Sequence, residues 1–291
     1  MNRLLLTLAI TVSICVAEVV GGYLSGSLAL LSDAGHMLTD ILALLLSLFA
    51  LIFASRPADA RRTYGYYRLE IISAFLNGLL LFSLSAGLLY SAWLRSQHPK
   101  PIEGGLMMVF AAIGLAGNVL GAYLLAGLRH NVNLRAAFLH VLSDGVSSVG
   151  VLLGSFFIYY KNAYGVDIAL SVLIAILIVV NSLRLLHEST SVLMESIPPG
   201  IDLASVRAEL LAVPGVSGVH DLHIWSISSD ISALSAHIVV SESSDVDSHG
   251  LLAELHRQLA ATFKIMHTTI QVETVKFESD CAEGLNGRSC A

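Results

Sequence analysis

The sequence predicts an all-α six-helix transmembrane domain followed by a small α+β domain. Its 291 residues are 55% hydrophobic and only 13% charged, whereas soluble domains carry about 25% charged residues. Six apolar stretches reach the roughly 20 residues that a helix needs to cross a bilayer. After residue 200 the apolar runs become short and take the alternating or helical spacing of a water-facing domain.

The six expected spans are separated by short connections that contain Gly, Pro or charged residues. They cover residues 4–24, 28–54, 69–94, 104–128, 136–160 and 166–186. An even number of crossings places both termini on one side. The basic residues at the span ends of that side are Arg3, Arg56, Arg61, Arg62, Arg68, Arg129, Arg135 and Arg184, against Arg95, Lys100 and Lys161 on the other. The positive-inside rule therefore predicts that both termini are cytoplasmic.

Five shorter elements follow the spans. We expect, in chain order, a helix at 202–212, strands at 216–228 and 231–240, a helix at 247–263 and a strand at 267–275. This αββαβ order is typical of a sheet with its helices on one face. The predicted division is a transmembrane domain over 1–194, a cytoplasmic domain over 195–278 and a flexible tail over 279–291.

The charge and the cysteines limit the partners and the compartment. Residues 1–194 carry 11 basic and 9 acidic side chains, whereas residues 195–291 carry 5 and 13. An acidic C-terminal region repels nucleic acid and attracts cations, so we expect no nucleic-acid partner. Three cysteines, Cys15, Cys281 and Cys290, are too few for a disulfide framework, which favours a reducing compartment for the tail.

The pattern His-x-x-x-Asp occurs twice inside apolar stretches, as His36 with Asp40 and as His140 with Asp144. Four residues make about one helical turn, so each pair projects from one helix face. An ionised Asp at mid-bilayer costs about 2.5–3.5 kcal/mol on insertion scales, which indicates a functional site. Two imidazoles and two carboxylates form a tetrahedral ligand set for Zn²⁺, whereas Mg²⁺ and Ca²⁺ prefer oxygen alone.

A simpler interpretation is that each histidine pairs only with the aspartate of its own helix. The repeat of one spacing in two separate spans favours a shared metal site instead. Close packing of the two helices would be helped by nearby small residues, which are Ala34, Gly35, Gly145, Ser147 and Ser148. We expect Glu18 to be a structural or cavity-facing carboxylate and Asp33 to lie at the mouth of the cavity.

Metal binding requires neutral histidine and ionised aspartate, so metal and protons compete for the same groups. A site at bilayer depth that opens to each face in turn would therefore act as a metal/H⁺ exchanger without an organic cofactor. An intramembrane zinc enzyme is the alternative, but the chain has no His-Glu-x-x-His and no Gly-x-Ser-x-Gly pattern. A metal receptor that is only anchored by its spans would need no charged groups inside them.

Four motifs across nearly the whole chain resemble the cation diffusion facilitator family, in its zinc, cobalt and cadmium resistance branch. They are the runs Ser27–Asp40, Tyr64–Glu70 and His220–Trp225, and the second His-x-x-x-Asp. The resemblance implies a homodimeric, proton-coupled exporter of Zn²⁺ in a bacterial plasma membrane, with Cd²⁺ and Co²⁺ as further substrates. It also implies a ferredoxin-like cytoplasmic domain that dimerises and senses metal.

The resemblance implies a second metal site in the cytoplasmic domain. In relatives, the positions of His220, His237 and an acidic or His position of the last strand bind metal at the dimer interface. That points to His220, His237 and Glu273, with His267 and His249 as additions. The alternative is that these are solvated surface histidines, as we expect for His223 and His256. Tail cysteines add thiolates in some relatives, but the spacing of nine between Cys281 and Cys290 is wider than the usual close pair and argues against it here.

Two connections lack the metal sites that some family members carry there. The connection between spans four and five offers only His130, and residues 55–68 contain Asp59 but no histidine. We therefore expect no strong metal site in either. The four arginines of residues 55–68 are interpreted as an anionic-lipid and salt-bridge surface.

Overall fold

The computed structural model describes residues 2–54, 58–126, 132–241 and 248–274. Arg56, His130, Cys281, Cys290 and the expected tail at 279–291 lie outside the described residues. The chain separates into two compact units, Met1–Phe49 with Ser73–Leu186, and Ala50–Ile72 with His187–Ala291. The segment that joins the second and third spans thus groups with the C-terminal domain.

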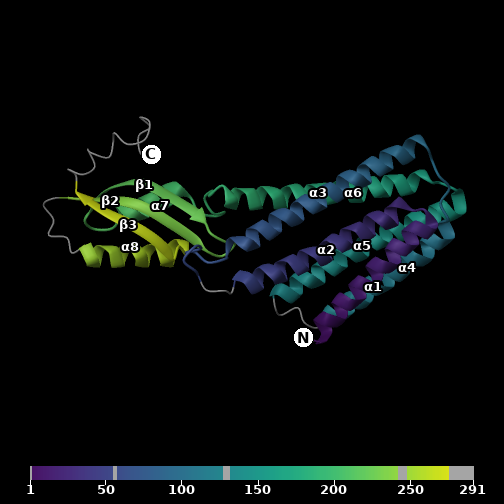
Figure 1. Cartoon of the computed structure of the whole chain (residues 1–291), viewed down its shortest axis with the longest axis horizontal. Helices are drawn as coiled ribbons and strands as arrows, with labels where there is room; N and C mark the ends of the chain where they lie inside the picture. The colour runs from purple at the N-terminus through teal and green to yellow at the C-terminus, as the bar shows by residue number, and fades with distance from the viewer. Residues whose placement is uncertain (1, 55–57, 127–131, 242–247, 275–291) are drawn as a thin grey trace. The chain divides into compact units, whose positions relative to one another are not determined.

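Six long helices confirm the expected spans (Figure 1). They are α1 (Asn2–Ser25), α2 (Leu28–Ala54), α3 (Arg68–Gln97), α4 (Gly104–Ala126), α5 (Val132–Lys161) and α6 (Gly165–Leu193). Each is long and apolar enough to cross a membrane. The observed α6 continues past the expected end at residue 186, because the polar residues after the apolar run extend the same helix.

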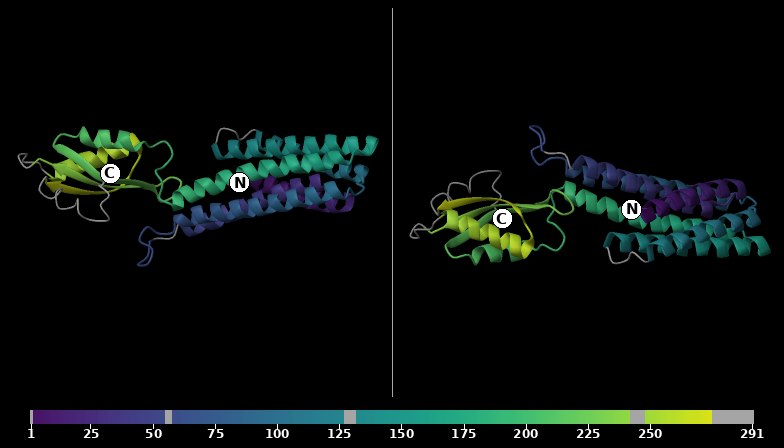
Figure 2. Two further views of the ribbon diagram at one scale, coloured as in Figure 1. Left: turned by 90° about the horizontal axis from the view of Figure 1, so that it is seen from above. Right: turned by 90° about the horizontal axis from the view of Figure 1, so that it is seen from below.

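In the first unit, α4 packs against both α1 and α5 (Figure 1, Figure 2). A Cβ atom at Gly117 of α4 would lie 2.5 Å from the end of the Ile14 side chain of α1, so a larger residue there would have to displace that side chain. Gly35 faces Leu84 of α3, and Gly145 faces Asn118 of α4. The neighbours of these two glycines therefore come from α3 and α4, and not from the α2–α5 contact that the sequence suggested.

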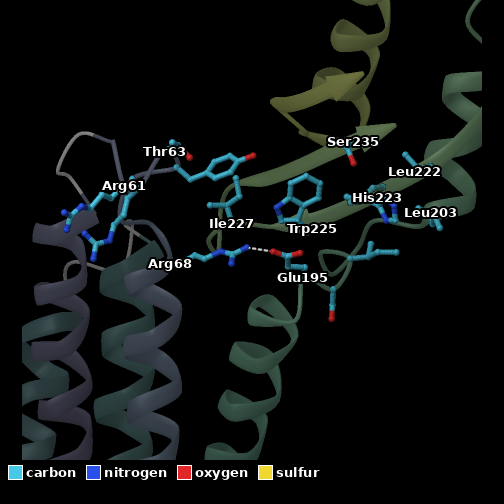
Figure 3. Close-up of a pocket in the computed structure, with 16 residues that line it drawn as sticks. Arg61, Thr63, Arg68, Glu195, Leu203, Leu222, His223, Trp225, Ile227 and Ser235 are labelled. Carbon is cyan, nitrogen blue, oxygen red and sulfur yellow. Dashed lines mark hydrogen bonds and ion pairs between the residues drawn. The ribbon is translucent and has the colours of Figure 1, made fainter. Parts of the chain in front are cut away.

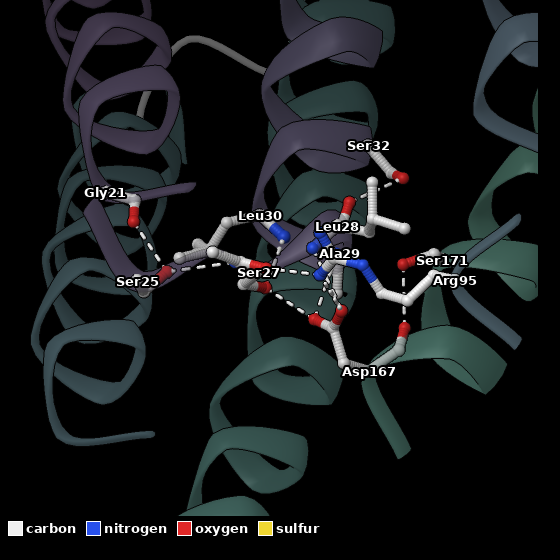
Figure 4. Close-up of polar contacts among 11 residues, drawn as sticks. Gly21, Ser25, Ser27, Leu28, Ala29, Leu30, Ser32, Arg95, Asp167 and Ser171 are labelled. Carbon is white, nitrogen blue, oxygen red and sulfur yellow. Dashed lines mark hydrogen bonds and ion pairs between the residues drawn. The ribbon is translucent and has the colours of Figure 1, made fainter. Parts of the chain in front are cut away.

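A buried carboxylate caps α2 from another helix (Figure 4). Asp167, near the start of α6, accepts hydrogen bonds from the Ser27 hydroxyl at 2.5 Å and from the N–H groups of Leu28 and Ala29 at 2.9 and 3.1 Å. A guanidinium nitrogen of Arg95, from α3, lies 3.5 Å from the same carboxylate. An anion at a helix N-terminus satisfies N–H groups that have no partner within the helix. Asp167 thus ties α2, α3 and α6 together at one end.

The C-terminal domain has the predicted αββαβ order. Its elements are α7 (Leu203–Leu211), β1 (Val216–Ser226), β2 (Ser232–Val240), α8 (Ser248–Phe263) and β3 (His267–Thr274). The sheet order is β1-β2-β3, with β1 antiparallel and β3 parallel to β2. Both helices pack on one sheet face, in a core that includes Val206, Leu210, Leu234, Ile238, Leu255 and Leu259. The opposite face is left for polar side chains.

Candidate metal centres

The two His-x-x-x-Asp pairs converge within the first unit. His36 and Asp40 lie on α2, and His140 and Asp144 on α5. Nε2 of His140 lies 3.4 Å from Oδ2 of Asp40, across the two helices. The contacts within each helix are longer, 3.6 Å for His36 with Asp40 and 3.8 Å for His140 with Asp144. Asp40 therefore contacts both histidines, whereas the contact of Asp144 is with the histidine of its own helix.

The spacing of these atoms suits one small ion. A tetrahedral Zn²⁺ with bonds of about 2.0–2.1 Å holds its ligand atoms about 3.3–3.4 Å apart. Oδ2 of Asp40 lies 3.4 and 3.6 Å from the two Nε2 atoms and is buried, yet it accepts no hydrogen bond from the described residues. Ligand atoms of His36, Asp40 and Asp144 all lie within 4.8 Å of one another. This group leaves out His140, so three of the four predicted ligands lie close enough together to share one divalent cation.

Buried polar residues surround this group. Asp33 of α2 is 3% exposed and accepts a hydrogen bond from the Ser147 hydroxyl of α5 at 2.8 Å. The next residue, Ser148, accepts a hydrogen bond from the Asn118 side chain of α4 at 3.0 Å. Asp33 is therefore an interhelical contact and does not lie open at a cavity mouth. Glu18 is 1% exposed, and neither of its oxygens has a hydrogen-bond partner among the described residues.

A second group of possible ligands lies on the polar face of the C-terminal sheet. His220 of β1, His237 of β2 and Glu273 of β3 come from three neighbouring strands. Nε2 of His220 lies 3.0 Å from one Glu273 oxygen, and Nδ1 of His237 lies 2.8 Å from the other. The contact of the buried His237 Nδ1 with Glu273 is a close one, but it does not have the geometry of a hydrogen bond. Two imidazole nitrogens and a buried carboxylate form a donor set that fits Zn²⁺.

The other predicted histidines lie elsewhere. His267, at the opposite end of β3 from Glu273, packs edge-on against the Tyr64 ring with centroids 5.3 Å apart. His249 lies on α8, which covers the other sheet face. His223 is exposed and contacts Asp221, and His256 contacts Thr268. The structure thus brings together His220, His237 and Glu273, and it does not bring His267 or His249 to them.

One carboxylate at the edge of this group, that of Asp221, is not predicted by the sequence. Asp221 has a φ of +48° and lies in a β-bulge, where the register shifts between the pair His220–His237 and the pair His223–Ser235. Because β1 has one extra residue here, the side chains before and after the bulge stay on the same sheet faces as their partners in β2. It also leaves Oδ2 of Asp221 3.7 Å from Nε2 of His237. Strand alternation alone does not predict this position.

Comparisons with known proteins agree over nearly the whole length of the chain. The model of a cation efflux transmembrane domain matches residues 4–194, and that of a cation efflux protein, cytoplasmic domain, matches residues 198–275. The metal cation efflux system protein CzcD of Cupriavidus metallidurans is 42% identical over 287 residues, which cover 98% of this chain and 90% of that protein. The zinc transporter ZitB of Escherichia coli is 38% identical over 294 residues, with 99% and 93% covered.

Two further matches are an antiporter and a solved C-terminal domain. The cadmium, cobalt and zinc/H(+)-K(+) antiporter of Bacillus velezensis is 37% identical over 281 residues, which cover 95% of this chain and 90% of that protein. A solved metal-bound C-terminal domain of the CzcD transporter is 42% identical over 25% of this chain and 99% of that domain, with a TM-score of 0.24. None of these matches supports the alternative of an intramembrane zinc enzyme. The chain belongs to the cation efflux family, and it is a membrane transporter of metal cations and not an enzyme.

Proposed function

We propose that this protein exports Zn²⁺ from the cytoplasm in exchange for H⁺, with Cd²⁺ and Co²⁺ as further substrates. The observation that carries the proposal is the contact between His140 and Asp40, which is shorter than the contact within either helix. Relatives named as a zinc transporter and as a cadmium, cobalt and zinc/H(+)-K(+) antiporter support this choice of substrates.

In this proposal, His36, Asp40, His140 and Asp144 hold the transported ion. The ion needs neutral imidazoles and ionised carboxylates, whereas protons neutralise the carboxylates and charge the imidazoles. Protons that reach the site from outside therefore release the metal, and cytoplasmic metal displaces the protons. A change in the packing of α2 against α5 would expose the site to one face at a time, so that each exchange moves the ion.

We place the protein in a bacterial plasma membrane with both termini in the cytoplasm. The excess of arginine at the span ends on the side of the termini supports this orientation. The matches to residues 4–194 and 198–275 support a boundary between the two domains near residue 194. The C-terminal domain would then face the compartment from which the ion is taken.

We also propose that the C-terminal domain binds Zn²⁺ through His220, His237 and Glu273 and forms a homodimer. The buried carboxylate of Glu273, held between two imidazoles, supports the metal site. The side chains lie on the sheet face opposite α7 and α8, and Glu273 is buried there. Bound metal would supply positive charge there that holds the three side chains together.

Purified protein in vesicles with an imposed pH gradient tests the exchange. We expect Zn²⁺ movement that depends on the gradient and is lost in Asp40→Asn and in Asp144→Asn, because each variant removes one anionic ligand without changing its size. Glu254→Gln removes a half-buried carboxylate of α8 that lies outside both proposed metal sites, so it is the matched control and keeps full flux. Zn²⁺ flux that persists in Asp40→Asn, or that ignores the pH gradient, contradicts the proposal.

A further inference from the structure

A basic pocket of about 1020 Å³ lies between the α2–α3 connection and β1, within the second unit (Figure 3). Arg61, Arg62 and Arg68 line it from the connection, and Trp225 and His223 line it from the strand. The transport site lies in the other unit, so the pocket is not part of it. Its charge and its position call for a separate explanation.

The connection that supplies the arginines is held in shape by Asp59. Its carboxylate accepts hydrogen bonds from the N–H groups of Arg61 and Arg62 at 2.7 and 2.8 Å, and from the Tyr66 hydroxyl at 2.9 Å. The Arg61 N–H, followed by the Tyr66 hydroxyl, lowers the pKa of Asp59 from its ordinary value. The carboxylate therefore stays ionised at neutral pH. Its hydrogen bonds fix the turn that carries Arg61 and Arg62 before any ligand binds.

The walls of the pocket are joined to each other. Arg68 forms an ion pair with Glu195 at 2.9 Å (Figure 3). The Ser229 hydroxyl, after β1, donates a hydrogen bond to the Glu70 carboxylate at 2.7 Å. The Tyr64 ring packs against His267 of β3. These contacts hold the connection against the sheet, so the space between them is a formed pocket.

The lining contains more basic side chains than acidic ones. Its three arginines face a single carboxylate, Glu195, which is already paired with Arg68. Arg62 lies over the Tyr66 ring and 4.0 Å from Asp59. Arg61 has no ion-pair partner among the residues that the structure describes, although its backbone is fixed by Asp59. A guanidinium with free N–H groups on a fixed backbone suits the two-point binding of a phosphate.

We propose that this pocket binds a phosphate group, through Arg61 and Arg62, at the membrane surface. The connection follows one span directly and precedes the next, which puts its arginines at the level of lipid headgroups. Anionic headgroups attract such basic sites. The volume exceeds that of a phosphate alone and leaves room for a headgroup or for a soluble phosphate ester beside Trp225. The site is independent of the ion exchange proposed above.

Trp225 provides a direct readout, because the chain has only two tryptophans. In a Trp93→Phe background, Trp225 is the only tryptophan. The protein is placed in nanodiscs of phosphatidylcholine, which receive either increasing phosphatidylglycerol or soluble pyrophosphate. We expect a saturating change in Trp225 emission. Arg61→Gln raises the half-saturating concentration about tenfold or more, as expected for the loss of one charge-assisted contact. Arg257→Gln removes the same charge on α8 and leaves the curve unchanged.

The outcomes separate the sources of the phosphate. A response to phosphatidylglycerol alone means that the pocket binds a lipid headgroup. A response to pyrophosphate alone means that it binds a soluble phosphate ester. A response to both means that it binds any exposed phosphate group. Arg61→Lys keeps the positive charge but loses the forked guanidinium, so it should bind the phosphate with intermediate strength. Intermediate binding would also show that the loss in Arg61→Gln is not caused by a defect in folding. No saturable response with either probe, or equal responses in wild type and in both Arg61 variants, overturns the proposal.

Discussion

Nε2 of His140 on α5 lies 3.4 Å from Oδ2 of Asp40 on α2, closer than either histidine lies to the aspartate of its own helix. Asp40 is thus shared by two imidazoles that are far apart in the sequence. A local contact within each helix would not require α2 and α5 to meet. The shared carboxylate means that the site depends on how these two helices are placed.

If Asp40 and His140 hold one ion, their contributions to metal affinity are not independent. We expect Asp40→Ala and His140→Ala each to abolish most Zn²⁺ binding, and the double variant to lose little more than either alone. Calorimetric titration in detergent measures this, with Glu273→Gln in every protein to remove the C-terminal site. Losses that simply add would show that the two side chains do not share an ion.

The two imidazoles should also set the choice of metal. His140→Asp replaces a nitrogen ligand by oxygen, which favours harder ions such as Mn²⁺. We expect the ratio of Zn²⁺ to Mn²⁺ transport to fall about tenfold, equivalent to about 1.4 kcal/mol of relative affinity. His98→Asp, at an exposed position directly after α3, introduces the same change outside the site and leaves the ratio unaltered. Vesicle uptake of each metal alone gives the ratio, and an unchanged ratio in His140→Asp rules out this role.

The C-terminal group predicts stabilisation by metal. At a Zn²⁺ concentration 100 times the Kd, binding adds about 2.7 kcal/mol to the stability of the folded domain. Heat unfolding of the full-length protein in the Trp93→Phe background, followed by the emission of Trp225 in β1, should shift upward with Zn²⁺ when the metal site is wild type. The shift should disappear in Glu273→Gln and persist in Glu254→Gln. A full shift in Glu273→Gln would place the metal elsewhere.

The cap at the start of α2 should be a major source of stability. Asp167→Asn leaves the Arg95 guanidinium, whose side chain is only 17% exposed, without its charged partner. Breaking a buried pair in this way costs about 3–5 kcal/mol. Denaturant titration should show that loss, and a smaller one for Asp167→Asn combined with Arg95→Gln. Ser171→Ala removes only a bond to the Asp167 backbone, so its stability should stay close to that of wild type. Similar stability of Asp167→Asn and wild type would contradict this role.

The cap of α7 should depend on pH. The Ser205 hydroxyl and N–H, at 2.7 and 2.9 Å, lower the pKa of Asp202. A lowered pKa in the folded state means that the stabilisation is complete above the unfolded value, about pH 4. It is lost as the pH falls through the folded value. Asp202→Asn keeps a capping oxygen but has no titration, so its stability relative to wild type should rise as the pH is lowered below 4. A difference in melting temperature between Asp202→Asn and wild type that is the same at all pH values would refute this.

Much of the fold was predictable because it depends on local patterns. The six spans follow from long apolar runs, and the αββαβ order follows from short alternating or helical ones. The spacing of His36 with Asp40, and of His140 with Asp144, also follows from one turn of helix. The prediction for the C-terminal histidines was less specific: strand alternation puts both His267 and Glu273 on one face of β3, but it does not say which of them lies beside His220.

The sequence by itself determined which stretches are apolar, which side chains can bind metal and which residues share a face of one element. These properties depend on neighbours within a few residues. Only the tertiary structure decided that Asp40 meets His140, that a bulge brings Asp221 toward His237, that Asp167 caps α2 from 140 residues away and that the α2–α3 connection groups with the sheet. Those contacts join distant parts of the chain, and packing selects them from the many partners that the same residue types allow.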